Sequence, residues 1–171
     1  NVISSGHRNQ QGLTIVGDNI FITEHGPRGG DEVNLIQKGK DYGWPFYSYG
    51  YAYSGKNIHR SPHQKNAEEP LFYFSPSIGI SEIVYYEGSE FPYWNKKFLV
   101  LSLKYRSLFL LDYDLDKNRI KSSERINIGH RLRDIAVMPS GKIFLITDDQ
   151  KLINLSRSSK DNHIESEKIS F

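Results

Sequence analysis

The chain has 171 residues, no cysteine and a formal net charge of +2, from 22 Lys and Arg against 20 Asp and Glu. The lack of cysteine excludes disulfides and thiolate metal sites, and the mixed, nearly balanced charges give no electrostatic support for nucleic-acid binding. No apolar run is long enough to cross a bilayer. An aromatic share of 13%, spread over short Val, Ile, Leu, Phe and Tyr runs, favours an all-β chain with one ordinary core.

The predicted strands are short apolar runs bounded by turn residues. They cover residues 13–16, 20–24, 33–36, 71–74, 83–86, 98–103, 108–114, 119–128, 135–138, 143–147 and 152–155. Gly17-Asp18-Asn19 predicts a tight hairpin turn between the first two strands, and residues 115–118 predict another turn. The stretch 38–69 is too irregular for regular structure and too aromatic for disorder, which is typical of a functional loop.

The ends of the chain differ from its middle. We expect one domain over residues 1–156 and a polar C-terminal tail over residues 157–171 that frays, because apolar residues become scarce there. Since the only methionine is Met138 and residues 6–12 already resemble the middle of a domain, we expect the chain to be a piece of a longer protein.

An internal repeat groups the predicted strands. The strand–turn–strand pattern of residues 13–24 is repeated at 135–148 and, more loosely, at 83–101. Repeated units of three or four antiparallel strands are typical of propeller blades. The chain holds about three such units, whereas a closed propeller needs about four to eight. We therefore predict part of a ring, with a three-blade unit that pairs with a second copy as the alternative.

The segment 26–32 reads as a site. It places three glycines, Pro27, Arg28 and two carboxylates in seven positions between two apolar segments. Glycine allows the backbone to bring its carbonyl groups close to a ligand, and carbonyl and carboxylate oxygens together suit a hard cation such as calcium. Arg28 has the wrong charge for that cation and would face an anion. The loop predicts a metal and an acid side by side.

Polar side chains near this loop form two further candidates. Arg8 and Asn9 stand just before a strand, where a guanidinium and an amide can bind a planar ligand; a capped turn is the alternative. Glu32 and Tyr42 could share a calcium ion, with Tyr42 supplying its backbone carbonyl.

Basic residues mark the strand ends in the second half of the chain. Lys104 follows the strand at 98–103 where a hairpin turns, and Arg131 and Arg133 stand two apart, so that both face one way in an extended chain. Solvent exposure is the simpler interpretation for each of them alone. In a propeller, however, strand ends are where ligands bind.

Taken together, the motifs resemble those of a known family. They run in the order His7-Arg8-Asn9-x-Gln11-Gly12, residues 24–34, Tyr42-Gly43-Trp44-Pro45, Ser102-Leu103-Lys104 and Arg131-x-Arg133-Asp134. This combination resembles the pyrroloquinoline quinone (PQQ) dependent soluble sugar dehydrogenases, and within the glucose/sorbosone dehydrogenase group it is most similar to the aldose sugar dehydrogenases. The resemblance extends over about residues 6–155.

The resemblance implies a fold, a reaction and a location. Members of the family are six-bladed β-propellers of four-stranded antiparallel sheets, of which this chain would be the C-terminal half. They oxidise the anomeric hydroxyl of aldose sugars to lactones, transfer hydride to PQQ activated by Ca²⁺, and pass electrons to an external acceptor. They are usually exported, which implies a periplasmic or secreted protein whose N-terminal half of the propeller is missing here.

The resemblance also assigns residues. The cofactor contacts would be Arg8, Asn9, Tyr53, Ser102, Leu103, Lys104, Arg131, Leu132 and Arg133. Gly26 and Pro27 would hold the calcium that activates the quinone, and Glu32 and Tyr42 would hold a second, structural calcium. The cofactor carries three carboxylates, so that the positive charge of these contacts has the right sign.

Two departures from the family pattern limit the assignment. Gln10 replaces the proline that usually follows the Arg-Asn pair. The histidine general base of the family belongs to a segment upstream of that pair, and we assign that role to neither His7 nor His25. We therefore expect the isolated chain to be inactive, and a non-catalytic ligand-binding propeller is the alternative function.

Overall fold

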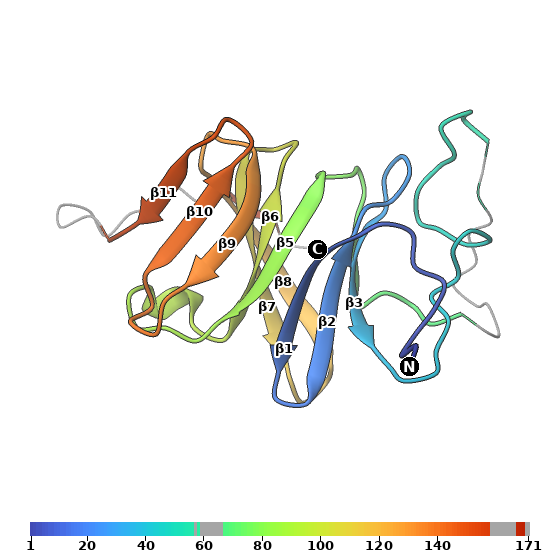
Figure 1. The fold of residues 1–171 in the computed structure, drawn as a ribbon, viewed down its shortest axis with the longest axis horizontal. Coiled ribbons are helices and arrows are strands. Elements are labelled where there is room, and N and C mark those ends of the chain that lie inside the picture. The colour runs from blue at the N-terminus through green and yellow to red at the C-terminus, as the bar shows by residue number, and fades with distance from the viewer. Residues whose placement is uncertain (57, 59–66, 158–166, 170–171) are drawn as a thin grey trace. The chain divides into compact units, whose positions relative to one another are not determined.

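The computed structural model describes residues 1–56, 58, 67–157 and 167–169 (Figure 1). The chain divides into two compact units, Asn1–Ile80 and Ser81–Phe171. Both units are built from antiparallel strands, and all of them except β12 pair with their neighbours in the sequence, so that the predicted all-β fold is confirmed. No helix among the described residues is long and apolar enough to span a membrane.

The first unit contains one four-stranded sheet. Its strands are β1 (Gln10–Val16), β2 (Asn19–Glu24), β3 (Asp31–Ile36) and β4 (Phe72–Phe74), which pair in chain order. The two-residue turn between β1 and β2 uses Gly17 at a φ of 59°, a left-handed conformation that glycine adopts without steric cost. Alternate residues Phe21, Thr23 and Val33 are fully buried, whereas Leu13 and Ile15 on β1 are exposed.

The second unit contains two sheets. One has the order β12-β8-β7-β6-β5, and the other has the order β11-β10-β9. The bounds are β5 (Ile80–Tyr86), β6 (Lys97–Ser102), β7 (Ser107–Asp114), β8 (Arg119–Asn127), β9 (Leu132–Val137), β10 (Ile143–Thr147), β11 (Leu152–Leu155) and β12 (Glu167–Ile169). A short 3-10 helix, Pro92–Trp94, precedes β6.

One hydrophobic cluster fills the second unit. It includes Leu99 and Leu101 of β6, Leu108 and Leu110 of β7, and Ile135, Ile143 and Leu145 of β9 and β10. Within each strand these residues are two apart, because alternate side chains of a strand point to the same face. The residues on the opposite faces of these strands, Phe98 and Val100 of β6 and Phe109 and Leu111 of β7, are also buried. Both faces of β6 and β7 are therefore covered.

The predicted repeat corresponds to the first two strands of each sheet. These are β1 with β2, β5 with β6, and β9 with β10. The sheets contain four, five and three described strands rather than four each. β12 accounts for the fifth strand, because it fills the hydrogen-bonding edge that β8 would otherwise leave open.

The expected tail over residues 157–171 lies mostly outside the described residues. Its segment Glu167–Ile169 forms β12, in register with residues 123–125 of β8.

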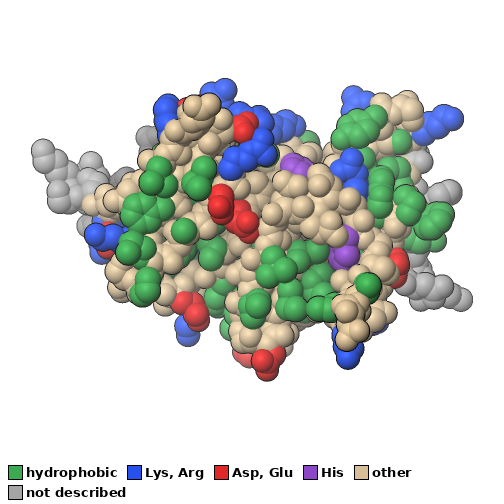
Figure 2. All heavy atoms as spheres, viewed as in Figure 1, with side chains coloured by type: hydrophobic (Ala, Val, Ile, Leu, Met, Phe, Trp, Pro, Cys, Tyr) green, Lys and Arg blue, Asp and Glu red, His purple; other side chains and the backbone are tan. Residues whose placement is uncertain are grey.

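Figure 2 shows apolar side chains exposed over β10 and β11, where Ile146 and the paired Leu152 are 49% and 69% accessible.

Candidate functional site

The β2–β3 loop packs its backbone against a second loop. A Cβ atom added at Gly26 would lie 2.0 Å from the carbonyl oxygen of Gly29, and one added at Gly30 would lie 2.5 Å from the backbone nitrogen of Gly50. Real Cβ atoms do not approach so closely, so these positions require glycine. Tyr51 donates its N–H to the carbonyl of Arg28 at 3.0 Å, which fixes the second loop on the first. The glycines predicted as ligand-binding residues therefore also serve this close approach.

Asp31 holds the same loop in place through hydrogen bonds. Its fully buried carboxylate accepts hydrogen bonds from the N–H of Gly26 at 3.1 Å, from the hydroxyl of Ser77 at 2.7 Å and from the N–H of Ile80 at 3.0 Å. Asp31 therefore fixes the position of Gly26 relative to the start of β3.

Arg8 is held in front of this loop by several groups. Its backbone N–H donates to Glu24 at 2.7 Å, its Nη1 donates to the carbonyl of His25 at 2.9 Å, and its guanidinium lies 5.2 Å from the centre of the Trp44 ring. Its Nη2 lies 3.5 Å from the hydroxyl of Tyr53, so that two of the predicted cofactor contacts meet. The buried Nε of Arg8 has no hydrogen-bond partner among the described residues.

Two carboxyl groups lie close together behind Arg8. Glu24 and Glu32 are register partners on β2 and β3, and the amide nitrogen of Asn34 donates to both, at 2.7 and 3.2 Å. Burial, followed by the negative charge of Glu24, raises the pKa of Glu32 from 4.5 to about 8. The amide oxygen of Asn34 is buried and has no partner among the described residues. The arrangement is rich in oxygen, and the charges of described residues that raise the pKa of Glu32 are all those of acidic groups.

Tyr42 and His7 close the other side of this group. Their rings stack with centroids 4.6 Å apart, and His7 Nδ1 lies 2.9 Å from Glu24 while its Nε2 lies 2.9 Å from the hydroxyl of Ser4. The buried Tyr42 hydroxyl donates to the carbonyl of Leu35 and accepts the N–H of Gln37. The Tyr42 side chain is thus packed rather than exposed.

A cavity of about 10 Å³ joins these features. That volume is near the minimum that holds one water-sized occupant. Its lining includes Arg8, Gly26, Glu32 and Tyr42, so that four residues predicted from the sequence meet at one place.

Two further predicted residues of this unit lie close to the same loops. Pro27 is buried in the loop next to Gly50, and the exposed Asn9 accepts a hydrogen bond from Gln11 at 3.1 Å.

The second unit brings two predicted arginines to one carboxylate. Arg131 Nε donates to Asp148 at 2.7 Å and Arg133 Nε donates to the other oxygen of Asp148 at 2.6 Å. The hydrogen bond from Arg131, which has the larger effect, and the hydrogen bond from Arg133 both lower the pKa of Asp148. The expectation that Arg131 and Arg133 face one way agrees with this geometry.

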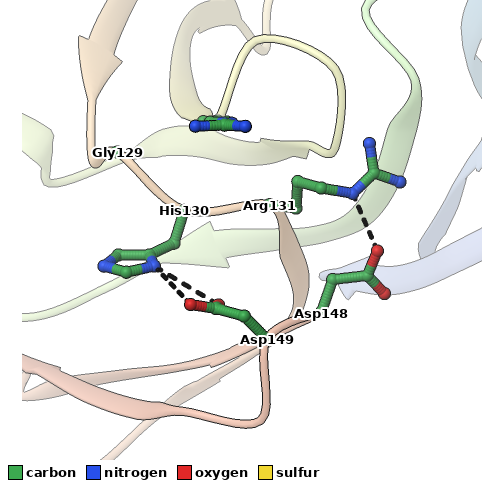
Figure 3. Close-up of a pocket in the computed structure, with 6 residues that line it drawn as sticks. Gly129, His130, Arg131, Asp148 and Asp149 are labelled. Carbon is green, nitrogen blue, oxygen red and sulfur yellow. Dashed lines mark hydrogen bonds and ion pairs between the residues drawn. The ribbon is translucent and has the colours of Figure 1, made fainter.

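A larger pocket of about 380 Å³ lies beside Arg131 (Figure 3). Arg106, Gly129, His130, Asp148 and Asp149 complete its lining. His130 Nδ1 lies 3.0 Å from Asp149, to which Lys151 also donates at 2.8 Å. Hydrogen bonds from Lys151 and then Thr147 lower the pKa of Asp149.

The remaining predicted contacts of this unit are mostly buried. Leu132 is fully buried in the hydrophobic cluster, and Ser102 and Leu103 are buried at the end of β6. Contact with a ligand at Leu132 would therefore have to involve its backbone. Lys104 is exposed in the turn after β6, with its Nζ 5.4 Å from the Tyr105 ring centre.

The structure adds three polar residues to which sequence reasoning gave no role, Glu24, Asn34 and Asp148, and it shows Asp31, predicted as one of the two loop carboxylates, bound to the N–H of Gly26. Each stands at the end of a strand or within it, where a polar residue interrupts the apolar pattern. That interruption was the available signal. The partners could not be read from the sequence, because Asp148 is 15 and 17 positions from the arginines that it joins.

A comparison with protein families decides the relationship. The family described as Glucose / Sorbosone dehydrogenase matches residues 1–154. The chain belongs to this family. The aldose sugar dehydrogenase YliI of Escherichia coli (strain K12) is 35% identical over 150 residues, which are 85% of this chain and 40% of that protein. Quinoprotein glucose dehydrogenase B of Acinetobacter calcoaceticus is 42% identical over 59 residues, or 31% of this chain and 12% of that protein.

Solved structures agree with this membership of the glucose/sorbosone dehydrogenase family. The soluble aldose sugar dehydrogenase of Escherichia coli in its apo form superposes with a TM-score of 0.82 at 32% identity, over 91% of this chain and 47% of that one. The three sheets match about half of a sugar dehydrogenase propeller. The chain therefore spans roughly two fifths to one half of the length of these relatives.

Proposed function

We propose that the chain is the cofactor-binding and calcium-binding part of a PQQ-dependent aldose sugar dehydrogenase. The whole protein would oxidise the anomeric hydroxyl of an aldose to a lactone and pass the electrons to an external acceptor. The observation that carries the proposal is the meeting of Arg8, Gly26, Glu32 and Tyr42 around one cavity in a chain of this family. When bound, PQQ supplies a quinone that accepts hydride.

The basic residues fit a cofactor with three carboxylates. Arg8 carries a buried Nε without a partner among the described residues, beside the hydroxyl of Tyr53. Arg131 and Arg133 donate through their Nε atoms to Asp148, and within the described part of the chain their terminal amino groups are left for a ligand. Lys104 is exposed in its turn. These side chains would bind and orient the cofactor through charge-assisted hydrogen bonds, with Asn9, Ser102, Leu103 and Leu132 beside them.

The acidic group fits a calcium ion. Among the described residues no three His, Cys, Asp or Glu side chains lie together as a ready metal site. A cation would instead combine Glu32 with the unpartnered amide oxygen of Asn34 and a backbone carbonyl of Tyr42, since calcium accepts such mixed oxygen ligands. Gly26 and Pro27 would offer backbone carbonyls to a second calcium next to the quinone.

We assign the general base to neither His7 nor His25, which do not match the position of the family's catalytic histidine. Both ring nitrogens of His7 are engaged, by Ser4 and Glu24. A base that takes the sugar's hydroxyl proton needs a free nitrogen within hydrogen-bond reach of that hydroxyl. We infer that the base belongs to the remaining part of the propeller. A binding propeller without chemistry is the second candidate function.

Export to the periplasm or to the exterior goes with this function, by similarity to the family. The lack of cysteine is compatible with it.

Titration of the chain with PQQ, with and without calcium, tests the proposal. Quenching of tryptophan fluorescence would report binding, because Trp44 lies beside Arg8. We expect saturable binding that strengthens when calcium is added and weakens about tenfold in Arg8→Gln, which loses one charged hydrogen-bonding group. Arg119→Gln, an exposed change on β8, is the matched control. Binding that ignores both calcium and Arg8 would exclude the proposed site.

A further inference from the structure

Asp148 occupies the point where the side chains of Arg131 and Arg133 meet. Its two carboxylate oxygens each accept one Nε–H, at 2.7 Å from Arg131 and 2.6 Å from Arg133. Its own backbone N–H donates to the carbonyl of Arg131 at 2.8 Å. Asp148 is therefore fixed to the segment whose side chains it holds.

Both guanidinium groups are held by one nitrogen only. Among the described residues, neither arginine makes a side-chain hydrogen bond or ion pair apart from that to Asp148. Figure 3 shows the terminal nitrogens of Arg131 directed away from Asp148. The two terminal amino groups of each arginine, which can together bind a carboxylate in a bidentate manner, thus remain available to a ligand.

Without this contact the two side chains would move freely. The side chains of Arg131 and Arg133 are 47% and 48% exposed, so that packing restrains them little. A long side chain loses rotamer freedom when a ligand immobilises it, and that loss weakens binding. A carboxylate that orders the arginines beforehand removes part of this loss.

We propose that Asp148 is a positioning residue, which orders Arg131 and Arg133 through their Nε atoms so that their terminal amino groups bind carboxylates of PQQ. This inference rests on the proposed function. Removal of Asp148 has two opposing effects on an anionic ligand: the site becomes more positive, and the arginines become disordered. The interaction with one exposed charge is weak in water, whereas two long side chains must be immobilised, so the disorder dominates.

The experiment compares PQQ binding by variants of the full chain in the presence of calcium. In Asp148→Ala we expect the Kd for PQQ to rise about tenfold although a negative charge has been removed. Asp148→Asn should lie between wild type and Asp148→Ala, because its amide oxygen still accepts one Nε–H. Thermal unfolding followed by circular dichroism checks that each variant folds.

Asp149→Ala is the matched control. It removes the same charge one position away, from a carboxylate that contacts His130 and Lys151 instead of the two arginines. We expect its Kd to change by less than about twofold. Should Asp148→Ala fail to fold, the comparison of Asp148→Asn with Asp149→Ala decides.

The outcomes separate two failures. If the wild-type chain binds no PQQ, the proposed function is wrong and this inference falls with it. If the wild type binds and Asp148→Ala binds equally or more tightly, or Asp149→Ala weakens binding as much, only the positioning role is wrong.

Discussion

The carboxyl group of Glu32 lies in surroundings that oppose its ionisation. Burial and then the charge of Glu24 raise its pKa from 4.5 to about 8, while the hydrogen bond from Asn34 acts in the opposite direction. At neutral pH the group retains its proton unless a cation takes its place. Proton and calcium therefore compete for the same oxygens.

The pKa of Glu32 predicts how stability depends on pH. The folded chain binds this proton more tightly than the unfolded chain, so the contribution to stability is complete below pH 4.5 and is lost as the pH rises through about 8. Relative to Glu32→Gln, the free energy of unfolding of the calcium-free wild type should fall over this range. Urea denaturation at a series of pH values measures the difference.

Calcium and a second variant serve as controls for this pH effect. Excess calcium should restore the stability of the wild type above pH 8, because binding to the folded state stabilises it, and should act less on Glu32→Gln. Glu87→Gln, at an exposed position, should follow the wild type at every pH. A wild type that runs parallel to Glu32→Gln throughout would show that Glu32 titrates normally.

At the scale of elements, the β2–β3 loop leaves no room for a side chain at Gly26. We expect Gly26→Ala to destabilise the chain by about 3 kcal/mol, because its Cβ would lie 2.0 Å from the Gly29 oxygen and the backbone would have to shift. Gly17→Ala is the control: it has a φ of 59° but nothing within 4 Å, so only the left-handed conformation costs it about 1 kcal/mol. Equal midpoints in urea would contradict the close approach.

The presence of the strands could be predicted from the alternation of apolar residues along the chain. Their exact first and last residues could not be predicted in this way. The prediction of 143–147 coincides with β10, whereas β5 begins at Ile80 and not at residue 83. The missed residues include Ser81, a polar residue that is buried because its hydroxyl donates to the carbonyl of Leu132 at 2.7 Å. A tertiary partner of this kind leaves no local signal. β12 was not predicted for the same reason, because it pairs with β8, a strand that is distant from it in the sequence.

The candidate site was predictable to a similar degree. Motif resemblance named Arg8, Glu32 and Tyr42, which do line one cavity, but it gave no role to Asn34 or Asp148. Residues that act through another side chain are recognised only when their distances are known.

At the scale of the whole molecule, each of the two units contains residues that we propose to bind the cofactor, and the chain spans about 40% of the aldose sugar dehydrogenase YliI. Binding and turnover can therefore be separated experimentally. The chain by itself should bind the cofactor and yet oxidise no sugar, because both ring nitrogens of His7 are engaged and neither His7 nor His25 matches the family's general base.

A dye-reduction assay measures this separation. The purified chain, loaded with PQQ and calcium, should reduce an artificial electron acceptor no faster with glucose or another aldose than without sugar. The Escherichia coli relative, assayed in parallel, verifies the reagents. Aldose-dependent reduction by the chain alone would mean that a base is present within these residues. In that case His25 is the histidine to replace first, since it lines the same cavity as Arg8 and Gly26.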